Sequence, residues 1–327
     1  MILAMCGKSY LKIGTGKGVH WSDVKEKKKR IVIVFVCIIL FIALIWCLIP
    51  RKYLERPKII LFLNGENGIT SKIMAGNELL LDDCREYLVD YSEEKQTILY
   101  LNEEEQIVEL DIQTGMSNKK NLLELGIYPT EEQEVHNLQY GPTEDEISFT
   151  FGEWIYIWNT ETEKLCKVVN PCIASITYNT YQWCDTGDLY FLHYRENTFA
   201  DLCFLEKGEN ESELIHSNIV SFVLNDSEDI IYAVEGYVKN NDIGFEMKYR
   251  IIEINLVDGT TRDLQKLKSN NFLLKNVDDR YLYYVEESVK KKNAKLYCLD
   301  LESGHKKCIF RTDREIVGII IENVNSQ

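Results

Sequence analysis

The sequence predicts an all-β fold, a six-bladed β-propeller of four-stranded antiparallel blades closed by the C-terminal strand, preceded by one N-terminal transmembrane helix. Two observations predict it: an uncharged apolar run near the N-terminus, and a strand-and-turn motif that recurs six times after that run. They divide the chain into a basic cytoplasmic tail (residues 1–30), the transmembrane helix (31–49), a stalk (50–57) and an extracytoplasmic propeller (58–327).

The apolar run predicts a membrane anchor. Residues 31–49 read IVIVFVCIILFIALIWCLI and carry no charge. As a helix rising ~1.5 Å per residue they extend about 28 Å, close to the roughly 30 Å of a bilayer's hydrocarbon core. Because a dense basic cluster ends at Arg30, we expect residues 1–30 to stay cytoplasmic and the large domain to lie outside the cell membrane. A cleaved signal peptide is the alternative, but the long charged segment before the run and the lack of a small-residue cleavage site disfavour it.

The charges are divided between the two ends of the chain. Residues 1–30 carry eight Lys/Arg and two Asp/Glu, whereas residues 50–327 carry 29 basic and 50 acidic side chains. The resulting net charges are +6 and −21. A domain this acidic lacks the basic face that phosphate binding needs, so nucleic acid is excluded as a partner.

Each copy of the recurring motif centres on an Asp, Asn or Glu that ends a predicted strand. An apolar residue stands immediately before this anchor, an aliphatic residue stands four positions before it, and in four copies a glycine stands four positions after it. Successive anchors are 47, 48, 47, 49 and 45 residues apart, a period typical of repeated supersecondary units. These fixed distances indicate that the anchors form turns. The anchors are Asn64, Asp111, Asn159, Glu206, Asn255 and Asp300.

Short strands account for the rest of each repeat. Runs rich in β-branched and aromatic residues, such as 97–101 (TILYL) and 230–234 (IIYAV), precede the anchored strands. Further runs, such as 272–277, lie before them, and segments such as 164–169 follow the turns. Four strands in about 47 residues make one propeller blade. We expect the last strand, 315–322, to pair with the first copy at Lys58 and so close the ring; a pair of β-sandwiches or an open solenoid is the alternative.

With these turns in view, residues 58–322 resemble the TolB-like six-bladed β-propellers, including forms tethered to bacterial membranes by one helix. The resemblance rests on the strand-Asp/Asn-x-x-x-Gly turns, seen from Leu110-Asp111 to Gly115 and from Leu299-Asp300 to Gly304. Two copies depart from the pattern, with Glu163 and Asn210 in place of the turn glycine. The resemblance implies a platform that binds proteins or other ligands, rather than a defined chemistry.

Recognition residues are expected where the chain departs from the repeat. The segment 236–248 is the longest predicted loop and carries Tyr237 and Phe245. A second aromatic group, Tyr178, Tyr181 and Trp183, lies between the strands of another blade. Aromatic side chains on rigid scaffolds are plausible recognition surfaces, although packing between blades is the alternative for Trp183.

No motif in the sequence predicts a cofactor, a metal site or a catalytic residue. There is no Cys-x-x-Cys, His-Glu-x-x-His or Gly-x-Ser-x-Gly. Cys298 and Cys308 lie symmetrically about a predicted turn, so they either face each other as a disulfide or are two buried thiols. His136, His193 and His216 would have to meet at the channel to form a metal site, which their spacing does not require.

The leading hypothesis is a single-pass protein of the cell membrane that presents a propeller as a binding or scaffolding module and has no catalytic activity. Its expected partners are the lipid bilayer, through the anchor helix, and a protein or cell-envelope ligand. The alternatives are a propeller lyase or hydrolase with a site at the channel mouth, and a transmembrane sensor that signals through its basic tail.

Overall fold

The described part of the chain consists almost entirely of β-strands. The computed structural model divides the chain into two units, Met1–Arg56 and Pro57–Gln327. It describes residues 58–65, 68–73, 78–81, 84–92, 94–130, 133–171, 180–194, 199–241, 244–268, 272–288 and 293–322. The predicted tail, transmembrane helix and stalk lie outside these residues. Within them, no helix combines the length and apolar character needed to cross a bilayer.

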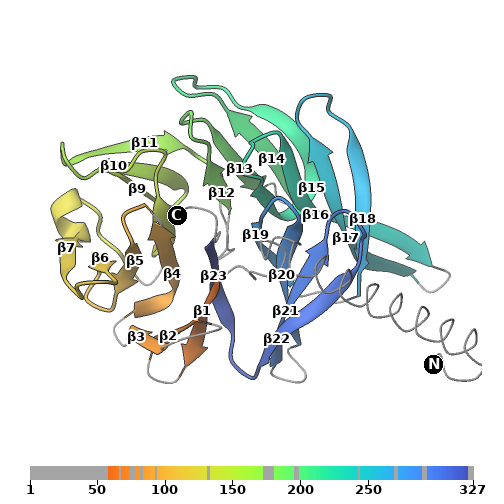
Figure 1. Cartoon of the computed structure of the whole chain (residues 1–327). Helices are drawn as coiled ribbons and strands as arrows, with labels where there is room; N and C mark the ends of the chain where they lie inside the picture. The colour runs from red at the N-terminus through yellow and green to blue at the C-terminus, as the bar shows by residue number, and fades with distance from the viewer. Residues whose placement is uncertain are drawn as a thin grey trace, which may run out of the picture. The chain divides into compact units, whose positions relative to one another are not determined.

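The strands form antiparallel sheets arranged around a common centre (Figure 1). One sheet has the order β23-β1-β2-β3, built from β1 (Lys58–Gly65), β2 (Gly68–Ile73), β3 (Glu78–Leu81) and β23 (Ile316–Glu322). The next contains β4 (Cys84–Ser92), β5 (Thr97–Asn102), β6 (Gln106–Asp111) and β7 (Ser117–Asn121), followed by a 3-10 turn at Leu122–Leu125. The third contains β8 (Val135–Tyr140), β9 (Glu146–Phe151), β10 (Trp154–Asn159) and β11 (Lys164–Val169).

A seven-stranded sheet follows, and a further four-stranded sheet precedes β23. The former contains β12 (Tyr181–Trp183), β13 (Leu189–Tyr194), β14 (Ala200–Leu205), β15 (Glu213–Leu224), β16 (Ile230–Asn241), β17 (Gly244–Asn255) and β18 (Thr261–Leu267). The latter contains β19 (Phe272–Val277), β20 (Tyr281–Ser288), β21 (Asn293–Asp300) and β22 (Lys306–Thr312). The expected all-β, antiparallel character is confirmed.

The long strand β15 belongs to both halves of the seven-stranded sheet. Its first part pairs with β14, from Phe204↔Glu213 to Ala200↔Ile219. Its second part pairs with β16, from Ile219↔Glu235 to Leu224↔Ile231. Register shifts in both pairings mark the place where β15 turns from one half to the other. One continuous strand therefore joins two four-stranded units.

The first and last strands pair as expected from the sequence. In the antiparallel register of β1 and β23, Lys58 lies opposite Glu322 and Leu61 opposite Ile319. The position of β1 in its sheet was not anticipated. Asp111, Asn159 and Asp300 each end the third strand of a sheet, but Asn64 lies on β1, the second strand after β23. Asn64 is therefore out of phase with the other anchors, because β2 and β3 both follow it in the same sheet.

The turns after four of the anchors share one hydrogen-bonding pattern. The Asp111 carboxylate accepts bonds from the backbone amides of Gln113 and Thr114, at 2.8 and 2.9 Å. Asn159, Asn255 and Asp300 accept equivalent bonds from their own turns. The residue four positions on has positive φ in each case: 69° at Gly115, 54° at Glu163, 70° at Gly259 and 69° at Gly304. The predicted turn-forming role is confirmed for these four anchors.

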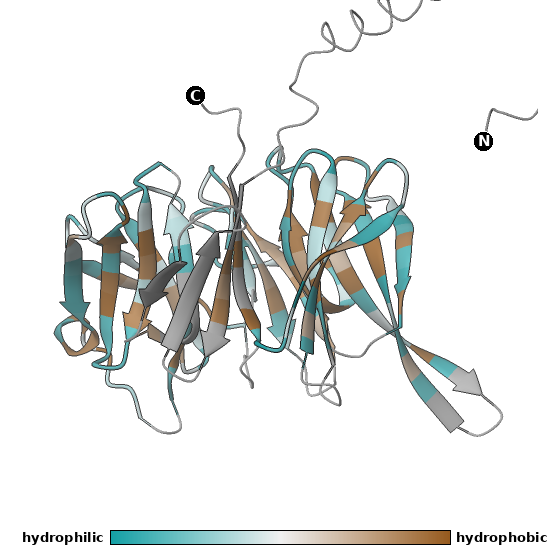
Figure 2. Cartoon of the chain, turned by 60° about the horizontal axis from the view of Figure 1, so that its bottom comes forward, coloured by the Kyte–Doolittle hydropathy of each residue, from teal (hydrophilic) through white to brown (hydrophobic). Residues whose placement is uncertain are grey.

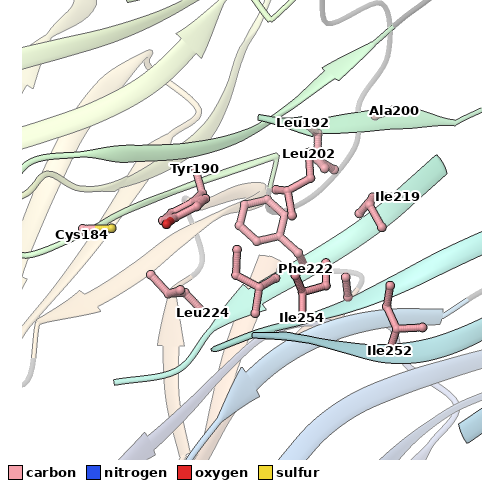
Figure 3. Packing of buried hydrophobic residues seen from close by; sticks show 12 residues of the cluster. Cys184, Tyr190, Leu192, Ala200, Leu202, Ile219, Phe222, Leu224, Ile252 and Ile254 are labelled. Carbon is pink, nitrogen blue, oxygen red and sulfur yellow. The ribbon is translucent and has the colours of Figure 1, made fainter. Parts of the chain in front are cut away.

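Apolar side chains fill the space between neighbouring sheets. One buried cluster lies within the seven-stranded sheet, where Figure 3 shows Phe222 lying between Leu202 and Ile254. Another joins this sheet to the next one, through residues such as Val234 and Tyr284. Each of these residues is less than 3% exposed. The sheets are therefore held face to face by apolar contacts between their strands.

The innermost strands are also tied to one another by hydrogen bonds from side chain to backbone. These strands contact in sequence: β4 contacts β8, β15 contacts β19, and β23 contacts both β4 and β19. The Asp90 carboxylate on β4 accepts a bond of 2.9 Å from the Tyr140 amide on β8. The Gln139 side-chain amide on β8 then donates to the Tyr181 carbonyl on β12, at 3.3 Å.

Two further ties continue around the centre. Gln182 on β12 accepts a bond of 2.9 Å from the Leu224 amide on β15. The hydroxyl of Ser221, also on β15, accepts a bond of 3.5 Å from the Leu274 amide on β19. Each tie connects a polar side chain of one innermost strand to a backbone group of the next innermost strand.

The turn after Asp300 yields a prediction about pH. Its carboxylate accepts a bond from the Ser303 amide and pairs with Arg280, and these contacts lower the pKa of Asp300 to about 2. Because the folded-state pKa lies below the unfolded value near 4, the stabilisation is present above about pH 4 and is lost as the pH falls towards 2. Asp300→Asn keeps the turn, as Asn255 does, but removes the charge.

We therefore expect wild type to unfold at higher denaturant concentration than Asp300→Asn at pH 7, with the difference disappearing near pH 2. Denaturant midpoints measured between pH 7 and 2 test this. Glu161→Gln, in the turn after Asn159, is the matched control and should show no such loss. An Asp300→Asn difference that stays constant with pH would contradict the assignment.

Candidate functional site

Tyr181 and Trp183 lie between two sheets. Tyr181 on β12 is only 2% exposed, and its hydroxyl donates to the Asn137 carbonyl at 2.9 Å. The Ser148 hydroxyl on β9 lies 3.1 Å from the Tyr181 hydroxyl and accepts a bond of 2.9 Å from the Trp183 indole. Both aromatic residues thus connect β12 to the preceding sheet, which fits packing between sheets. Tyr178, expected beside them, lies outside the described residues.

The predicted loop 236–248 is a two-stranded ribbon. The ladder between β16 and β17 continues without interruption from Ile230↔Asn255 to Asn241↔Gly244. Only residues 242–243, outside the described residues, connect the strands. The expectation of a loop was wrong because Tyr237 and Val238 favour extended structure and the strands simply extend past their neighbours. Asn240-Asn241-Asp242 before Gly244 is typical of a hairpin turn and would have indicated this.

The ribbon has one charged face and one apolar face. Paired residues share a face, so Tyr237 with Lys248 and Lys239 with Glu246 lie on one side, and Val238 with Met247 lies on the other. Val238 is 54% exposed. Figure 2 shows β16 and β17 extending together beyond the other strands. The ribbon is therefore an exposed departure from the repeated architecture.

Tyr237 takes part in a charged network at the base of this face. The Arg250 guanidinium lies over its ring, 5.5 Å from the centroid. Arg250 also forms ion pairs with Glu235 and with Asp263, the latter at 2.9 Å. These contacts hold the Tyr237 ring at the base of the ribbon. Phe245, the second aromatic residue expected here, pairs with Asn240 in the ladder; its side chain is outside the described part.

Aromatic packing fixes where the ribbon leaves the sheet. Phe199 lies directly over Gly236, where an added Cβ would come 2.1 Å from the ring. The Phe199 ring meets the Tyr249 ring edge to face at 6.2 Å, and Tyr249 meets Phe272 at 4.9 Å. Phe272 is the first residue of β19. Aromatic contacts thus join the base of the ribbon to the neighbouring sheet, at the end of that sheet where β19 begins.

The ribbon and the start of β1 lie at opposite ends of the sheets. Glu287 near the end of β20 and Glu315 just before β23 both influence the pKa of Lys275, so these segments lie close together. β23 therefore starts at the ribbon's end and runs to the other end, where Glu322 pairs with Lys58. The chain enters the domain at Lys58. The end that carries the ribbon is the one remote from this entry point.

Partly buried polar groups gather near the centre at the ribbon's end. Burial lowers the pKa of Lys275 on β19 to about 8, an effect opposed by the nearby carboxylates of Glu287 and Glu315. Burial also raises the pKa of Glu287. On β8, burial lowers the pKa of His136. Innermost strands thus carry Lys275 and His136, and the carboxylates of Glu287 and Glu315 lie near Lys275, but this chemistry alone does not define a reaction.

The other end is acidic. Burial raises the pKa of Asp226 after β15, and the charges of Asp279, Asp278 and Asp185 on neighbouring turns raise it further. The Asp185 amide donates a bond of 2.6 Å to Glu228, linking two of these turns. The turns that follow the innermost strands therefore place like charges close together at the end where Lys58 lies.

The three histidines considered for a metal site lie on three strands, two of which belong to the seven-stranded sheet. His136 is on β8, His193 on β13 and His216 on β15, where its Nδ1 lies 2.9 Å from the Ser217 carbonyl. Among the described residues there is no group of three or more His, Cys, Asp or Glu side chains that could hold a metal ion.

Cys298 and Cys308 are free thiols and do not face each other. A register shift between β21 and β22 places Cys308 opposite Tyr297, and Cys298 opposite Lys307. Burial, with nearby Asp278 and Asp300, raises the pKa of the Cys298 thiol to about 11. The symmetric spacing about the turn suggested a direct pairing, but the shift moves the two cysteines one position apart.

Comparisons with known proteins identify the fold. No known protein family and no curated protein matches the sequence. TolB from Acinetobacter baumannii is similar in structure, with a TM-score of 0.57 and 13% identity over 76% of this chain. The matched region spans 62% of TolB, less than two thirds of its length. A chain of the nidogen/laminin complex has a TM-score of 0.58 and 10% identity, covering 82% of this chain and 99% of that one.

A protein from Lactobacillus plantarum shows a similar relation, with a TM-score of 0.51, 12% identity, and coverage of 82% of this chain and all of that one (100%). At these identities the similarity concerns the fold alone. The described domain therefore has a β-propeller fold similar to that of TolB, as the sequence resemblance implied.

The packing at Gly236 yields a second prediction. Gly236→Ala would force a Cβ into the Phe199 ring, so we expect a loss of about 1–3 kcal/mol of stability, the usual cost of overpacking. Phe199→Ala removes the obstacle. In that background Gly236→Ala should cost much less. Denaturant unfolding of the four variants as a double-mutant cycle measures the coupling. Equal costs in both backgrounds would contradict the contact.

Proposed function

We propose that this chain is a single-pass protein of the cell membrane whose extracytoplasmic part, residues 58–327, is a six-bladed propeller that binds a partner and has no catalytic activity. The blade count is supported by the described strands: if β15 counts once in each half of its sheet, the 23 strands supply 24 positions, four for each of six blades. The pairing of β1 with β23 supports closure of the ring.

The membrane anchor in this proposal is the apolar run 31–49. The basic residues before it favour a cytoplasmic N-terminus and contact with the lipid bilayer on that side. The remainder of the chain would then be outside the cell. A chain that enters the propeller at Lys58 leaves the opposite end, with the ribbon, open to other molecules. This arrangement of entry point and ribbon is the observation that carries the proposal.

The partner that fits best is a protein or another polymer of the cell envelope. The ribbon offers a fixed aromatic ring at Tyr237, an exposed apolar residue at Val238 and both signs of charge at Lys239 and Glu246. Such mixed surfaces on a rigid support are typical of protein recognition. The nidogen/laminin structure, in which a similar propeller chain occurs in a complex between proteins, adds support for a protein ligand.

The topology is tested by adding protease to intact cells that express the full chain. We expect residues 58–327 to be cleaved from outside and the tail 1–30 to be protected. Antibody tags at each end report the fragments. Protection of the C-terminal tag, with the cells shown to be intact, would rule out the proposed orientation.

Partner binding is tested by shortening the ribbon. Tyr237 and Lys248 lie opposite each other, so residues 238–247 can be replaced by Asn-Gly, which closes a two-residue hairpin. We expect cross-linking of the full chain to its partner in cells to fall at least about tenfold, the loss that follows when anchor residues worth about 1.4 kcal/mol are removed. Val257→Ser, at the other end of β17 and 83% exposed in wild type, is the control that should cross-link normally. Unchanged cross-linking of the shortened variant would place the binding surface elsewhere.

A propeller lyase or hydrolase is the second candidate, favoured by Lys275, Glu287 and His136 near the centre. It is tested by incubating the full chain with cell-wall polysaccharides and peptides. Turnover by wild type that is lost in Lys275→Met would favour the enzyme; absence of turnover by wild type leaves the binding role favoured.

A further inference from the structure

The sheet that contains β1 is assembled differently from the other described sheets. Each of the others consists of strands that follow one another along the chain, whereas here β23 joins β1, β2 and β3 from the far end of the described residues. β23 is the end strand of this sheet, and its ladder is with β1. We call this pairing of β1 with β23 the seam. Because no short connection joins its two strands, the seam is where the ring of sheets can open while the sheets of consecutive strands stay intact.

The ladder of the seam is interrupted near one end. Leu63 pairs with Ile316 but Phe62 pairs with Gly318, so β23 has one residue more than β1 at this point. A bulge of this kind disrupts the local ladder. The guanidinium of Arg314, just before β23, donates a bond of 2.7 Å to the Leu63 carbonyl. A side chain therefore holds β1 at the position where the backbone pairing is weakened.

The residue after Arg314 interacts with the neighbouring sheet on the other side. The negative charges of Glu287 and Glu315 oppose the effect of burial on the pKa of Lys275, so the three side chains lie close together. Lys275 is the extra residue of a register shift between β19 and β20, and a bulge can redirect a side chain. Glu315 thus connects the start of β23 to β19 through opposite charges.

We propose that Arg314 and Glu315, in the connection between β22 and β23, form a latch that keeps the seam closed. Arg314 holds β1 and Glu315 holds β19, so two consecutive side chains attach the closing strand to two sheets. The backbone of the latch is itself fixed, because the Arg314 amide donates a bond of 3.0 Å to the Thr312 hydroxyl. Release of the latch lets β23 separate from β1, and the other sheets keep their structure.

The other part of the seam is held by a continuous ladder and by apolar packing. The register has no shift from Phe62 to Lys58. Leu61 and Ile319 lie opposite each other and belong to the apolar cluster that joins this sheet to the preceding one. Opening therefore begins at the latch, where the ladder is interrupted, and not at the end where the chain enters.

The latch lies at the same end of the sheets as the ribbon. Leu63 is near this end of β1, and Lys58 opposite Glu322 marks the other end. Lys275 follows three positions after Phe272, which packs against Tyr249 at the base of the ribbon. The seam thus opens at the end that is remote from the entry point.

The experiment measures amide hydrogen exchange in the full chain purified in detergent. We expect Arg314→Met to speed exchange in residues 59–63 and 316–321 at least about tenfold, as the loss of a charge-assisted hydrogen bond should. β9 and β10, in another sheet, should keep their wild-type rates. Arg314→Lys keeps a charged donor and should recover part of the protection. Arg280→Met, which removes an exposed ion pair with Asp300, is the matched control and should not change exchange at the seam.

The charges around Lys275 provide an independent measurement. Lys275→Met leaves the carboxylates of Glu287 and Glu315 close together without the positive charge, so exchange at the seam should be faster. Adding Glu315→Gln removes this repulsion, so the double variant should exchange more slowly at the seam than Lys275→Met alone.

Three results would overturn the proposal. One is a wild-type exchange rate at the seam in Arg314→Met, and another is an equal increase in β9 and β10, which would indicate a general loss of stability. The third is a double variant whose effect is the sum of those of Lys275→Met and Glu315→Gln measured singly. The measurement requires neither a partner nor a membrane, so the latch and the binding role can fail separately.

Discussion

The arrangement of the sheets depends on how each innermost strand is attached to the next. Apolar packing between sheet faces supplies most of the cohesion, but it does not by itself specify which strand lies nearest the centre. The side-chain ties do. Asp90, Gln139, Gln182 and Ser221 each bond to a backbone group of the next innermost strand. Each bond contributes only about 0.5–1.5 kcal/mol, yet a backbone group left without it would be costly.

These hydrogen bonds at the centre explain why the outer hairpins can differ in length from one sheet to another. Because the centre is held by bonds between adjacent strands, the outer hairpins are free to vary in length. β16 and β17 are twelve residues long, whereas β9 and β10 have six residues each. The aromatic contacts of Phe199, Tyr249 and Phe272 then fix the ribbon where it leaves the sheet. A rigid base with a projecting ribbon presents binding groups without the entropy cost of ordering a loop.

Periodicity predicted the strands well and their positions in the sheets less well. The runs 97–101, 230–234 and 272–277 are all strands, because alternating β-branched and aromatic residues require an extended, half-buried backbone. Asn64 resembles the other anchors in its local sequence but ends a second strand, because a strand from the far end of the chain occupies the first position. Cys298 and Cys308 were misjudged for a related reason, since a single register shift changes which residues face each other.

In the candidate site too, the sequence predicted local features better than the contacts between distant residues. Tyr237 lies where the chain departs from the repeat, on the ribbon, whereas Tyr181, chosen on the same grounds, is buried and hydrogen-bonded to Ser148 of a different sheet. By itself, the sequence determined the strand content, the turn-forming anchors and the apolar run, because these depend on residues a few positions apart. Only the tertiary structure decided the phase of the first sheet, the ties at the centre and the ribbon's place opposite Lys58. Those features depend on contacts between residues from about 40 to more than 250 positions apart, and sequence spacing carries little information about such contacts.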